Sequence, residues 1–315
     1  MLTLFSTPKP FEGNIRVIQN NALRSWKLLH PDIEVILFGD ETGTADTCRE
    51  LGMHHEPEVE RTEDGPPLVR SLFERAQQIS RHPVLCYCNC DIILGQDFLH
   101  AVERVLTWKS RFLMVGRRWD MDVTLPVDFS NPNWERDLRQ LVHREGVHHQ
   151  NDAIDYFAFP KELFTQIPPL AIARLWWDHW LIWKASIEKA AVVDASDMAF
   201  VVHQNHDYSY HPAGWQGLRN GDSARRNLEI AGGYWHLHTL EDATHRLTVT
   251  NIETRRLFWL APLRRWARRV GNPIRVWLWH PILCITRPLR HRIGLRQRNF
   301  RFSWSKRVRE RESDR

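Results

Sequence analysis

The sequence predicts an α/β protein in which a sheet is flanked by helices. Short apolar runs alternate with amphipathic stretches through the first half of the 315 residues, which is the pattern of strands and the helices that cover them. Hydrophobic residues make up 43% of the chain and charged residues 26%, and this composition excludes a wholly disordered protein. The length is sufficient for one large domain or two smaller ones.

The chain begins with a predicted strand, helix and strand. The apolar run Leu2–Ser6 predicts the first strand, and the Thr-Pro-Lys-Pro sequence after it predicts the loop that leaves the strand. Residues 15–29 carry apolar side chains at helical spacing, so we expect a helix there. The run Glu34–Phe38 predicts the second strand, which the following Gly-Asp pair closes.

The same alternation continues to residue 116. Residues 60–67 are polar and rich in Gly and Pro, so they read as a loop, and residues 83–87 are the most strand-like run in the protein. The predicted elements are a helix at 45–51, a strand at 54–58, a helix at 68–80, a strand at 83–87, a helix at 97–106 and a strand at 112–116.

The pattern loosens after residue 116. Residues 117–149 carry many charges and few clear periods, and residues 204–250 read mostly as loop. The elements expected between these stretches are a strand at 156–159, a Trp-rich helix at 173–186, and strands around 192–194 and 199–203.

The net charge of +5 is the sum of two opposite parts. Residues 254–315 hold 18 basic and 3 acidic side chains, whereas residues 1–253 hold 25 basic and 35 acidic ones. Within the basic part, residues 259–270 place Trp, Leu, Ala and Val on one side of a helix and four Arg on the other. This pattern is typical of a helix in a membrane interface, and anionic lipid attracts the remaining Arg.

We therefore expect an acidic α/β domain at residues 1–253 and a basic Trp/Arg-rich membrane-surface tail at residues 254–315. A helix packed on the body with a disordered basic end is the structural alternative. Nucleic-acid binding also suits Arg with aromatics, but the interleaved Leu, Ile and Trp favour a membrane surface and make nucleic acid an unlikely partner.

Cysteine usage and hydropathy indicate a cytoplasmic protein. Five cysteines, an odd number in a long chain, fit a reducing compartment better than a disulfide framework. The first residues lack the charged and apolar regions of a secretory leader, and no run approaches the ~20 apolar residues that cross a bilayer. With the basic tail, this predicts a peripheral location on the inner face of the membrane.

The run from residue 84 to residue 94 carries the most informative chemistry. A hydrophobic strand leads into Asn89 and Asp91, which are two residues apart and therefore expected on one face at its carboxyl end. Ligands of open α/β sheets bind at that edge, where a carboxylate and an amide oxygen can hold a hard divalent cation. The alternative is that both side chains only make turn and cap hydrogen bonds.

A second polar cluster ends a later strand-like run. His203 and His206 follow Val201 and Val202, and imidazole is a suitable ligand for an ion such as Mn²⁺. A pair of surface histidines is the alternative, because the chain contains 17 His. The two clusters together predict a metal site built from Asp91, with Asn89, and a histidine that is either His203 or His206.

These motifs resemble those of GT-A-type glycosyltransferases that use nucleotide-diphospho-sugars, family 2-like. The opening strand and helix, the strand that ends in Phe-Gly-Asp-Glu, and Tyr-Cys-Asn-Cys-Asp carry the resemblance over about residues 1–210. It implies a GT-A-like nucleotide-binding mixed sheet whose Asp-x-Asp motif is Asn89-Cys90-Asp91, with Asn replacing the first Asp. It also implies a late metal ligand at His203 and an acidic residue, Asp178, opening a helix near the acceptor.

The chemistry of glycosyl transfer gives Asp178 a role of its own. Inversion requires a base that takes the acceptor hydroxyl proton, and a carboxylate among aromatic side chains suits this task. Trp176, Trp177, Trp180 and Trp183 provide flat surfaces on which sugars stack. Several of these Trp fall at helical spacing, so part of the set is expected in the core, and Asp178 has the alternative of capping the helix.

Further polar residues are candidates for the donor site. Asp40 can accept hydrogen bonds from a base or ribose, or only close a turn, and Thr7 is expected near the nucleotide. The candidates for binding the diphosphate are Arg70, Arg75, Arg117 and Arg118, although the expected role of each is on the solvated surface. Asp155 is a candidate for binding a sugar hydroxyl or for capping a turn.

Three cysteines alternate with Asn89 and Asp91 along the run from residue 84 to residue 94. On a straight strand, Cys86, Cys88 and Cys90 are about 6.6 Å apart, so they are read as small buried hydrophobic residues and not as a zinc site.

The motifs and the resemblance together predict a metal-dependent glycosyltransferase, with Mn²⁺ or Mg²⁺ as cofactor. It moves a sugar from a nucleotide-diphosphate donor to an acceptor hydroxyl on a cell-surface glycan or a lipid-linked glycolipid precursor, in polysaccharide biosynthesis. A non-catalytic protein that binds nucleotide or membrane is one open alternative. A nucleotidyltransferase of similar fold is another, and it would release pyrophosphate from a nucleoside triphosphate.

Overall fold

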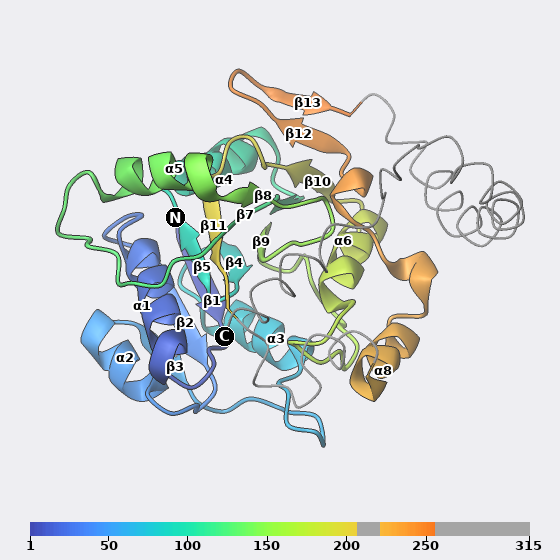
Figure 1. Ribbon diagram of the computed structural model, residues 1–315. Helices are drawn as coiled ribbons and strands as arrows, with labels where there is room; N and C mark the ends of the chain where they lie inside the picture. Colours follow the sequence, from blue (N-terminus) through green and yellow to red (C-terminus); the bar gives the residue numbers. More distant parts are fainter. Residues whose placement is uncertain (207–220, 256–315) are drawn as a thin grey trace, which may run out of the picture. The chain divides into compact units, whose positions relative to one another are not determined.

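Nine strands form one mixed sheet in residues 1–206 and 221–255, which are the residues that the computed structural model describes. The strand order is β13-β12-β10-β6-β9-β4-β1-β2-β3, so β4 lies between β9 and β1 near the middle of the sheet (Figure 1). The strands that run parallel to one another are β1 (Leu2–Ser6), β2 (Glu34–Phe38), β3 (His54–Glu56), β4 (Val84–Cys88), β6 (Phe112–Val115), β10 (Ala191–Asp194) and β12 (His245–Leu247). The antiparallel strands are β9 (Tyr156–Pro160) and β13 (Ile252–Thr254).

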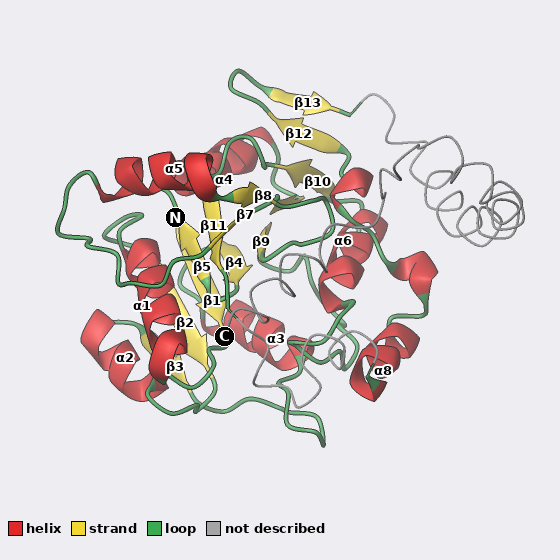
Figure 2. Cartoon of the chain, viewed as in Figure 1, coloured by secondary structure: helices red, strands yellow, loops and turns green. Residues whose placement is uncertain are grey.

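The sheet buries both faces, because alternate side chains of each strand enter two different cores. On one face, Leu2 and Leu4 pack with α1 (Gly13–Lys27), α2 (Thr44–Leu51) and α4 (Asp97–Trp108). On the other face, Phe5 packs with α3 (Val69–Ile79) and α6 (Trp177–Ile187). Helices α1 and α2 lie on one side of the central strands and α3 on the other (Figure 2). The central strands β1, β2 and β4 are therefore buried at every residue.

A smaller four-stranded sheet lies beside the large one, in the order β5-β11-β7-β8. Helix α5 (Trp134–Glu145) covers it with Leu138 and Val142, which pack against Met121 and Val202. The strands of this sheet are β5 (Ile92–Leu94), β11 (Val201–Gln204), β7 (Trp119–Met121) and β8 (Val147–His148). The last part of the described chain adds α8 (Asp222–Ile230) and two short 3₁₀ helices, η1 (Tyr234–His236) and η2 (Leu240–Asp242).

The predicted α/β class is confirmed, and the elements up to residue 116 lie within a few residues of their expected positions. The expectation that residues 204–250 are mostly loop is wrong, because their described part contains α8, η1, η2 and β12. The stretch 117–149, whose sequence has few clear periods, contains β7, α5 and β8. Helix α5 is difficult to recognise from an apolar pattern in the sequence, because only two of its twelve residues are buried.

The Trp-rich helix begins four residues later than predicted. Ala173 and Trp176 have positive φ angles of 58° and 89°, so the chain turns twice before α6 starts at Trp177. The start of α6 places Asp178 in its first turn.

The predicted tail lies outside the described residues from residue 256 onward. Among residues 1–206 and 221–255, no helix combines the length and the apolar character that spanning a bilayer requires.

Candidate functional site

The site begins at the carboxyl end of β4. The strand ends at Cys88, and a turn leads into β5, closed by a hydrogen bond from the backbone N–H of Ile92 to the carbonyl of Asn89 (3.1 Å). Asn89 and Asp91 therefore lie in a turn after the strand and not on the strand itself, so strand alternation does not position them. Their placement at the carboxyl edge of the sheet agrees with the prediction.

Pairing within the small sheet brings the two histidines to Asp91. Strand β11 runs antiparallel to β5 with His203 opposite Ile92, so His203 arrives beside the turn that carries Asp91. His203 Nε2 lies 3.8 Å from Asp91 Oδ2, and His206 Nε2 lies 3.2 Å from the same oxygen. One ligand atom from each of the three residues lies within 4.8 Å of the others.

Neighbouring residues keep the Asp91 carboxylate ionised. Burial opposes ionisation, but the positive charge of His203, the hydrogen bond with His206 and the charge of Lys9 outweigh it, so the pKa of Asp91 lies well below its usual range. Its second oxygen, Oδ1, is buried and has no hydrogen-bond partner among the described residues. An ionised carboxylate with an unused oxygen, next to two imidazoles, is a donor set that suits a divalent ion such as Mn²⁺.

A second carboxylate, Asp120 on β7, lies behind His203. Its Oδ1 is 3.3 Å from His203 Nδ1 and accepts a 2.8 Å hydrogen bond from Arg118 Nε, while its Oδ2 is 2.5 Å from His149 Nδ1. Burial opposes ionisation, but the hydrogen bond with His149, the close His203 imidazole and the charge of Arg118 keep the pKa of Asp120 well below its usual range. Asp120 cannot be singled out from the sequence, because it belongs to a charged stretch without periodicity.

Arg118 connects this carboxylate to the turn after β4. Its guanidinium forms an ion pair with Asp155, and Asp155 Oδ1 accepts a 2.8 Å hydrogen bond from Asn89 Nδ2. Burial lowers the pKa of Arg118, but Asp155 and Asp120 more than compensate and raise it above its usual value. Asp155, proposed from the sequence as a sugar ligand or a turn cap, instead fixes Arg118 and Asn89.

The candidate donor-site residues follow the carboxyl ends of β1 and β2. Thr7 comes directly after β1, and its hydroxyl is buried without a hydrogen-bond partner among the described residues. Lys9, which the sequence reasoning did not select, has its Nζ 3.2 Å from His206 Nε2. Asp40 is exposed in the loop after β2. The structure brings Lys9 directly to the metal-type cluster.

The first turn of α6 separates its aromatic residues from its acid. Trp177 is 6% exposed and packs edge-on against Tyr87 at 5.2 Å, and Trp180 is also buried, so both belong to the core. The Asp178 side chain is 21% exposed, and its nearest charged partner is His179 Nδ1 at 3.8 Å. Trp176 and Trp183 are partly buried against the same core.

The remaining sequence candidates have structural roles. Arg70 and Arg75 form ion pairs with Glu60 and Glu56 on the surface beside α3. Cys86, Cys88 and Cys90 are buried free thiols, and burial raises the pKa of Cys90 to about 12, so the expectation that they act as small hydrophobic residues is confirmed.

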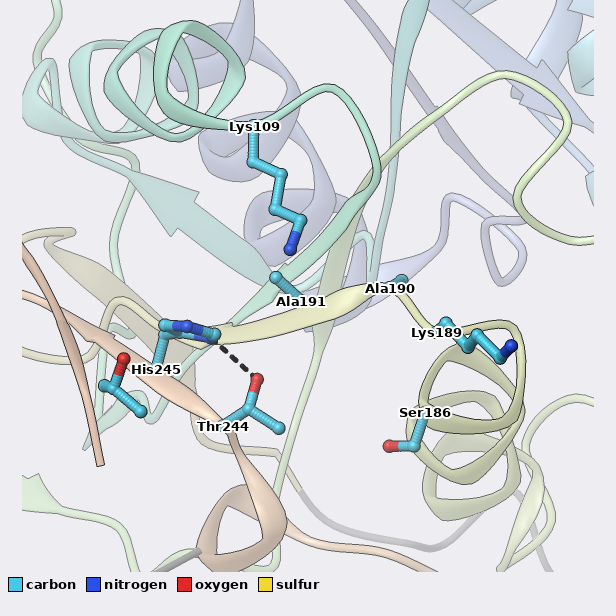
Figure 3. A pocket seen from close by; sticks show the side chains of 8 residues that line it. Lys109, Ser186, Lys189, Ala190, Ala191, Thr244 and His245 are labelled. Atoms are coloured by element: carbon cyan, nitrogen blue, oxygen red, sulfur yellow. Dashed lines mark hydrogen bonds between the residues drawn. The ribbon is translucent and has the colours of Figure 1, made fainter. Parts of the chain in front are cut away.

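A cavity of about 370 Å³ lies at the amino ends of β10 and β12, and Figure 3 shows the side chains that line it. Its lining includes Ala191, the first residue of β10, together with Lys109 after α4 and His245 on β12. Thr244 Oγ1, also in the lining, is 2.8 Å from His245 Nδ1. Because the Asp91 cluster lies beyond the carboxyl ends of the parallel strands, this amino-end cavity is not part of it.

Comparisons with known proteins complete the description. No protein-family model matches the chain, and no curated protein matches its sequence. The chain is similar to glucosyl-3-phosphoglycerate synthase from Mycobacterium tuberculosis, solved with Mg²⁺ and uridine-diphosphate, with a TM-score of 0.44, 14% identity, and coverage of 74% of this chain and 80% of that one.

It is also similar to S. aureus TarS 1-349, with a TM-score of 0.43, 10% identity, and coverage of 64% of this chain and 60% of that one. S. aureus TarS 1-349 has also been solved in complex with UDP-GlcNAc.

Proposed function

We propose that the chain is a metal-dependent glycosyltransferase that moves a sugar from a nucleotide-diphosphate donor to an acceptor hydroxyl. The observation that supports it is the convergence of Asp91, His203 and His206, whose ligand atoms lie within 4.8 Å of one another at the carboxyl edge of the sheet. Substrates of open α/β sheets bind at this edge. The buried and unused Oδ1 of Asp91 supports a bound cation, because an unpartnered buried carboxylate oxygen is unfavourable without one.

In this proposal the residues divide into a donor end and an acceptor end. Asp91, His203 and His206 hold the cation, which when bound neutralises negative charge on a diphosphate leaving group. Thr7, Asp40 and Asn89 lie on the loops that follow β1, β2 and β4, where a nucleotide would lie across the edge of the sheet. The buried Thr7 hydroxyl supports a polar ligand at that loop.

Asp178 acts at the acceptor end. The acceptor oxygen forms a bond with the anomeric carbon, the bond from that carbon to the diphosphate oxygen breaks, and its electron pair leaves with the diphosphate. The acceptor hydroxyl proton passes to the Asp178 carboxylate, which is partly exposed and has no charged partner closer than 3.8 Å among the described residues.

Calorimetry and product analysis test the proposal. Wild-type protein should bind UDP or GDP in the presence of Mn²⁺ and release the nucleoside diphosphate from a matching nucleotide sugar when an acceptor is supplied. Asp91→Ala should lose both the metal and the nucleotide, whereas Asp46→Ala, a change of an exposed carboxylate on α2, should lose neither. Absence of nucleotide binding in the wild type, or unchanged binding in Asp91→Ala, would contradict the proposal.

We further propose that the basic tail holds the enzyme at the inner, cytoplasmic face of a membrane, where lipid-linked glycan precursors are the acceptors. The sequence of residues 254–315 supports this, because its 18 basic and 3 acidic side chains complement anionic lipid. Vesicles that contain phosphatidylserine should co-sediment with the protein, and neutral vesicles should not. Replacing Arg264, Arg265, Arg268 and Arg269 with Glu should abolish co-sedimentation, and unchanged binding would overturn this part of the proposal.

A further inference from the structure

Lys9 is a cation at the edge of a cluster that is suited to hold another cation. Strands β1 and β4 are parallel neighbours with Phe5 opposite Tyr87, so the loops that follow the two strands emerge side by side (Figure 1). Lys9 and Asp91 each lie four residues beyond this pair. Lys9 Nζ is 3.2 Å from His206 Nε2, which in turn lies 3.2 Å from Asp91 Oδ2.

The backbone of Lys9 is fixed in place from both sides. Its N–H donates to Gln19 Oε1 at 2.7 Å, and its carbonyl accepts from Gln19 Nε2 at 2.9 Å. Gln19 is only 2% exposed, and it lies on α1, which packs against the sheet. The prolines at positions 8 and 10 restrict the chain further, because Pro10 keeps the preceding residue extended. The ammonium therefore reaches the cluster from a rigid attachment point.

This arrangement is unfavourable for a site that holds a metal ion alone. An ammonium in contact with one of the ligating histidines repels a divalent cation on that histidine. The repulsion is relieved when an anion binds between the two positive groups. A diphosphate suits this position, since its charged oxygens accept hydrogen bonds from an ammonium and also bind a hard cation.

We infer that Lys9 is a binding residue for the diphosphate of the donor, and that it makes tight binding of the cation depend on the nucleotide. This inference rests on the proposed function and adds to it a residue and an order of affinities. Without nucleotide, the Lys9 ammonium, 3.2 Å from His206 Nε2, opposes a cation on that histidine. With nucleotide, the same charge contributes to affinity for the donor.

Opposite effects on two binding constants test the inference. In the full-length protein, Lys9→Met should bind UDP in the presence of Mn²⁺ about tenfold more weakly, the loss expected for one charge-assisted hydrogen bond. The same variant should bind Mn²⁺ alone as tightly as the wild type or more tightly, measured by the electron paramagnetic resonance of free Mn²⁺. Lys9→Arg, which keeps the charge, should recover most of the UDP affinity.

A matched control is Lys27→Met, which removes a half-buried lysine of α1 whose Nζ donates to the Ile33 carbonyl at 3.5 Å, and it should change neither constant. An unchanged UDP affinity in Lys9→Met would overturn the inference, as would a parallel weakening of Mn²⁺ and UDP, which indicates a purely structural role. If Asp91→Ala loses Mn²⁺ while Lys9→Met still binds UDP normally, only the Lys9 assignment fails. If the wild type binds no nucleotide, the proposed function fails as well.

Discussion

His203 and Asp120 lie directly opposite each other on the parallel strands β11 and β7, with the imidazole Nδ1 3.3 Å from the carboxylate Oδ1. The other ring nitrogen of His203 faces Asp91. A carboxylate on one imidazole nitrogen fixes which nitrogen is available to a metal and raises the basicity of the ring. The register of β11 and β7 therefore places Asp120 beside His203, and through His203 it affects the geometry of the candidate metal site.

Asp120→Asn should therefore weaken Mn²⁺ binding by about 10- to 100-fold, the range found when such a supporting carboxylate is removed. The substitution keeps the size of the side chain but removes its charge from His203, Arg118 and His149. Isothermal titration calorimetry with MnCl₂ measures the change.

Two comparisons separate this effect from general damage. Asp46→Asn, on the exposed surface of α2, should bind Mn²⁺ as the wild type does. The thermal unfolding midpoint of Asp120→Asn in the absence of metal should stay within a few degrees of that of the wild type. Full Mn²⁺ affinity in Asp120→Asn would show that His203 needs no carboxylate behind it.

Asp178→Asn should separate binding from turnover. Because Asp178 is proposed to accept the acceptor proton, its loss should lower kcat by about 10²- to 10⁴-fold. The affinity for UDP with Mn²⁺ should stay unchanged, since the cation and diphosphate are assigned to other residues. Asp152→Asn, which alters an exposed acid near the same helix, is the control for kcat. Equal activity in Asp178→Asn and the wild type would remove Asp178 from the mechanism.

Much of this fold could be predicted because the central strands bury every residue. Leu2–Ser6 and Glu34–Phe38 are apolar runs whose local sequence alone indicates a strand. Strands β7 and β8 gave no such signal, since they contain three and two residues and depend on pairing with β11 or with each other. Their stability comes from contacts that are distant in sequence.

Some residues of the candidate site can likewise be predicted from the sequence, and others cannot. Asp91, His203 and His206 could be selected because polar residues of metal-binding type follow two strand-like runs. Lys9 and Asp120 could not, because their relevance depends on which strand ends meet. Lys9 reaches His206 across 197 positions of sequence, and only the three-dimensional structure joins them.

Trp177→Ala tests whether the Trp at the start of α6 belongs to the core. Trp177 is 6% exposed and packs against Tyr87 at 5.2 Å and Phe157 at 5.6 Å, so its removal should lower the free energy of unfolding by about 3–5 kcal/mol. Urea denaturation followed by circular dichroism measures this change. Trp176→Ala removes a partly buried neighbour and should have a smaller effect. A larger loss in Trp176→Ala than in Trp177→Ala would contradict the assigned packing.

Glu34 should make the stability of the fold depend on pH. Its carboxylate accepts hydrogen bonds from Thr3 Oγ1 (2.6 Å), from the Arg81 backbone (2.7 Å) and from Arg81 Nε (2.9 Å). Burial opposes its charge, but these bonds and the Arg81 charge outweigh that cost and lower the pKa of Glu34 below its ordinary value of 4.5. A lowered folded-state pKa means that ionised Glu34 stabilises the fold above the unfolded-state pKa, and that this stabilisation is lost as the pH falls through the folded-state pKa.

Glu34→Gln should accordingly lower the free energy of unfolding by about 1–3 kcal/mol near neutral pH, because the amide cannot satisfy three donors equally well. The difference from the wild type should narrow as the pH falls below 4.5, where protonation removes the same charge from the wild-type side chain. Arg81→Met is the matched control: its side chain is 71% exposed, so the change should cost about 1 kcal/mol or less while the backbone donor remains. Denaturant unfolding at several pH values measures all three proteins, and a difference between Glu34→Gln and the wild type that is constant with pH would show that the charge of Glu34 contributes nothing to stability.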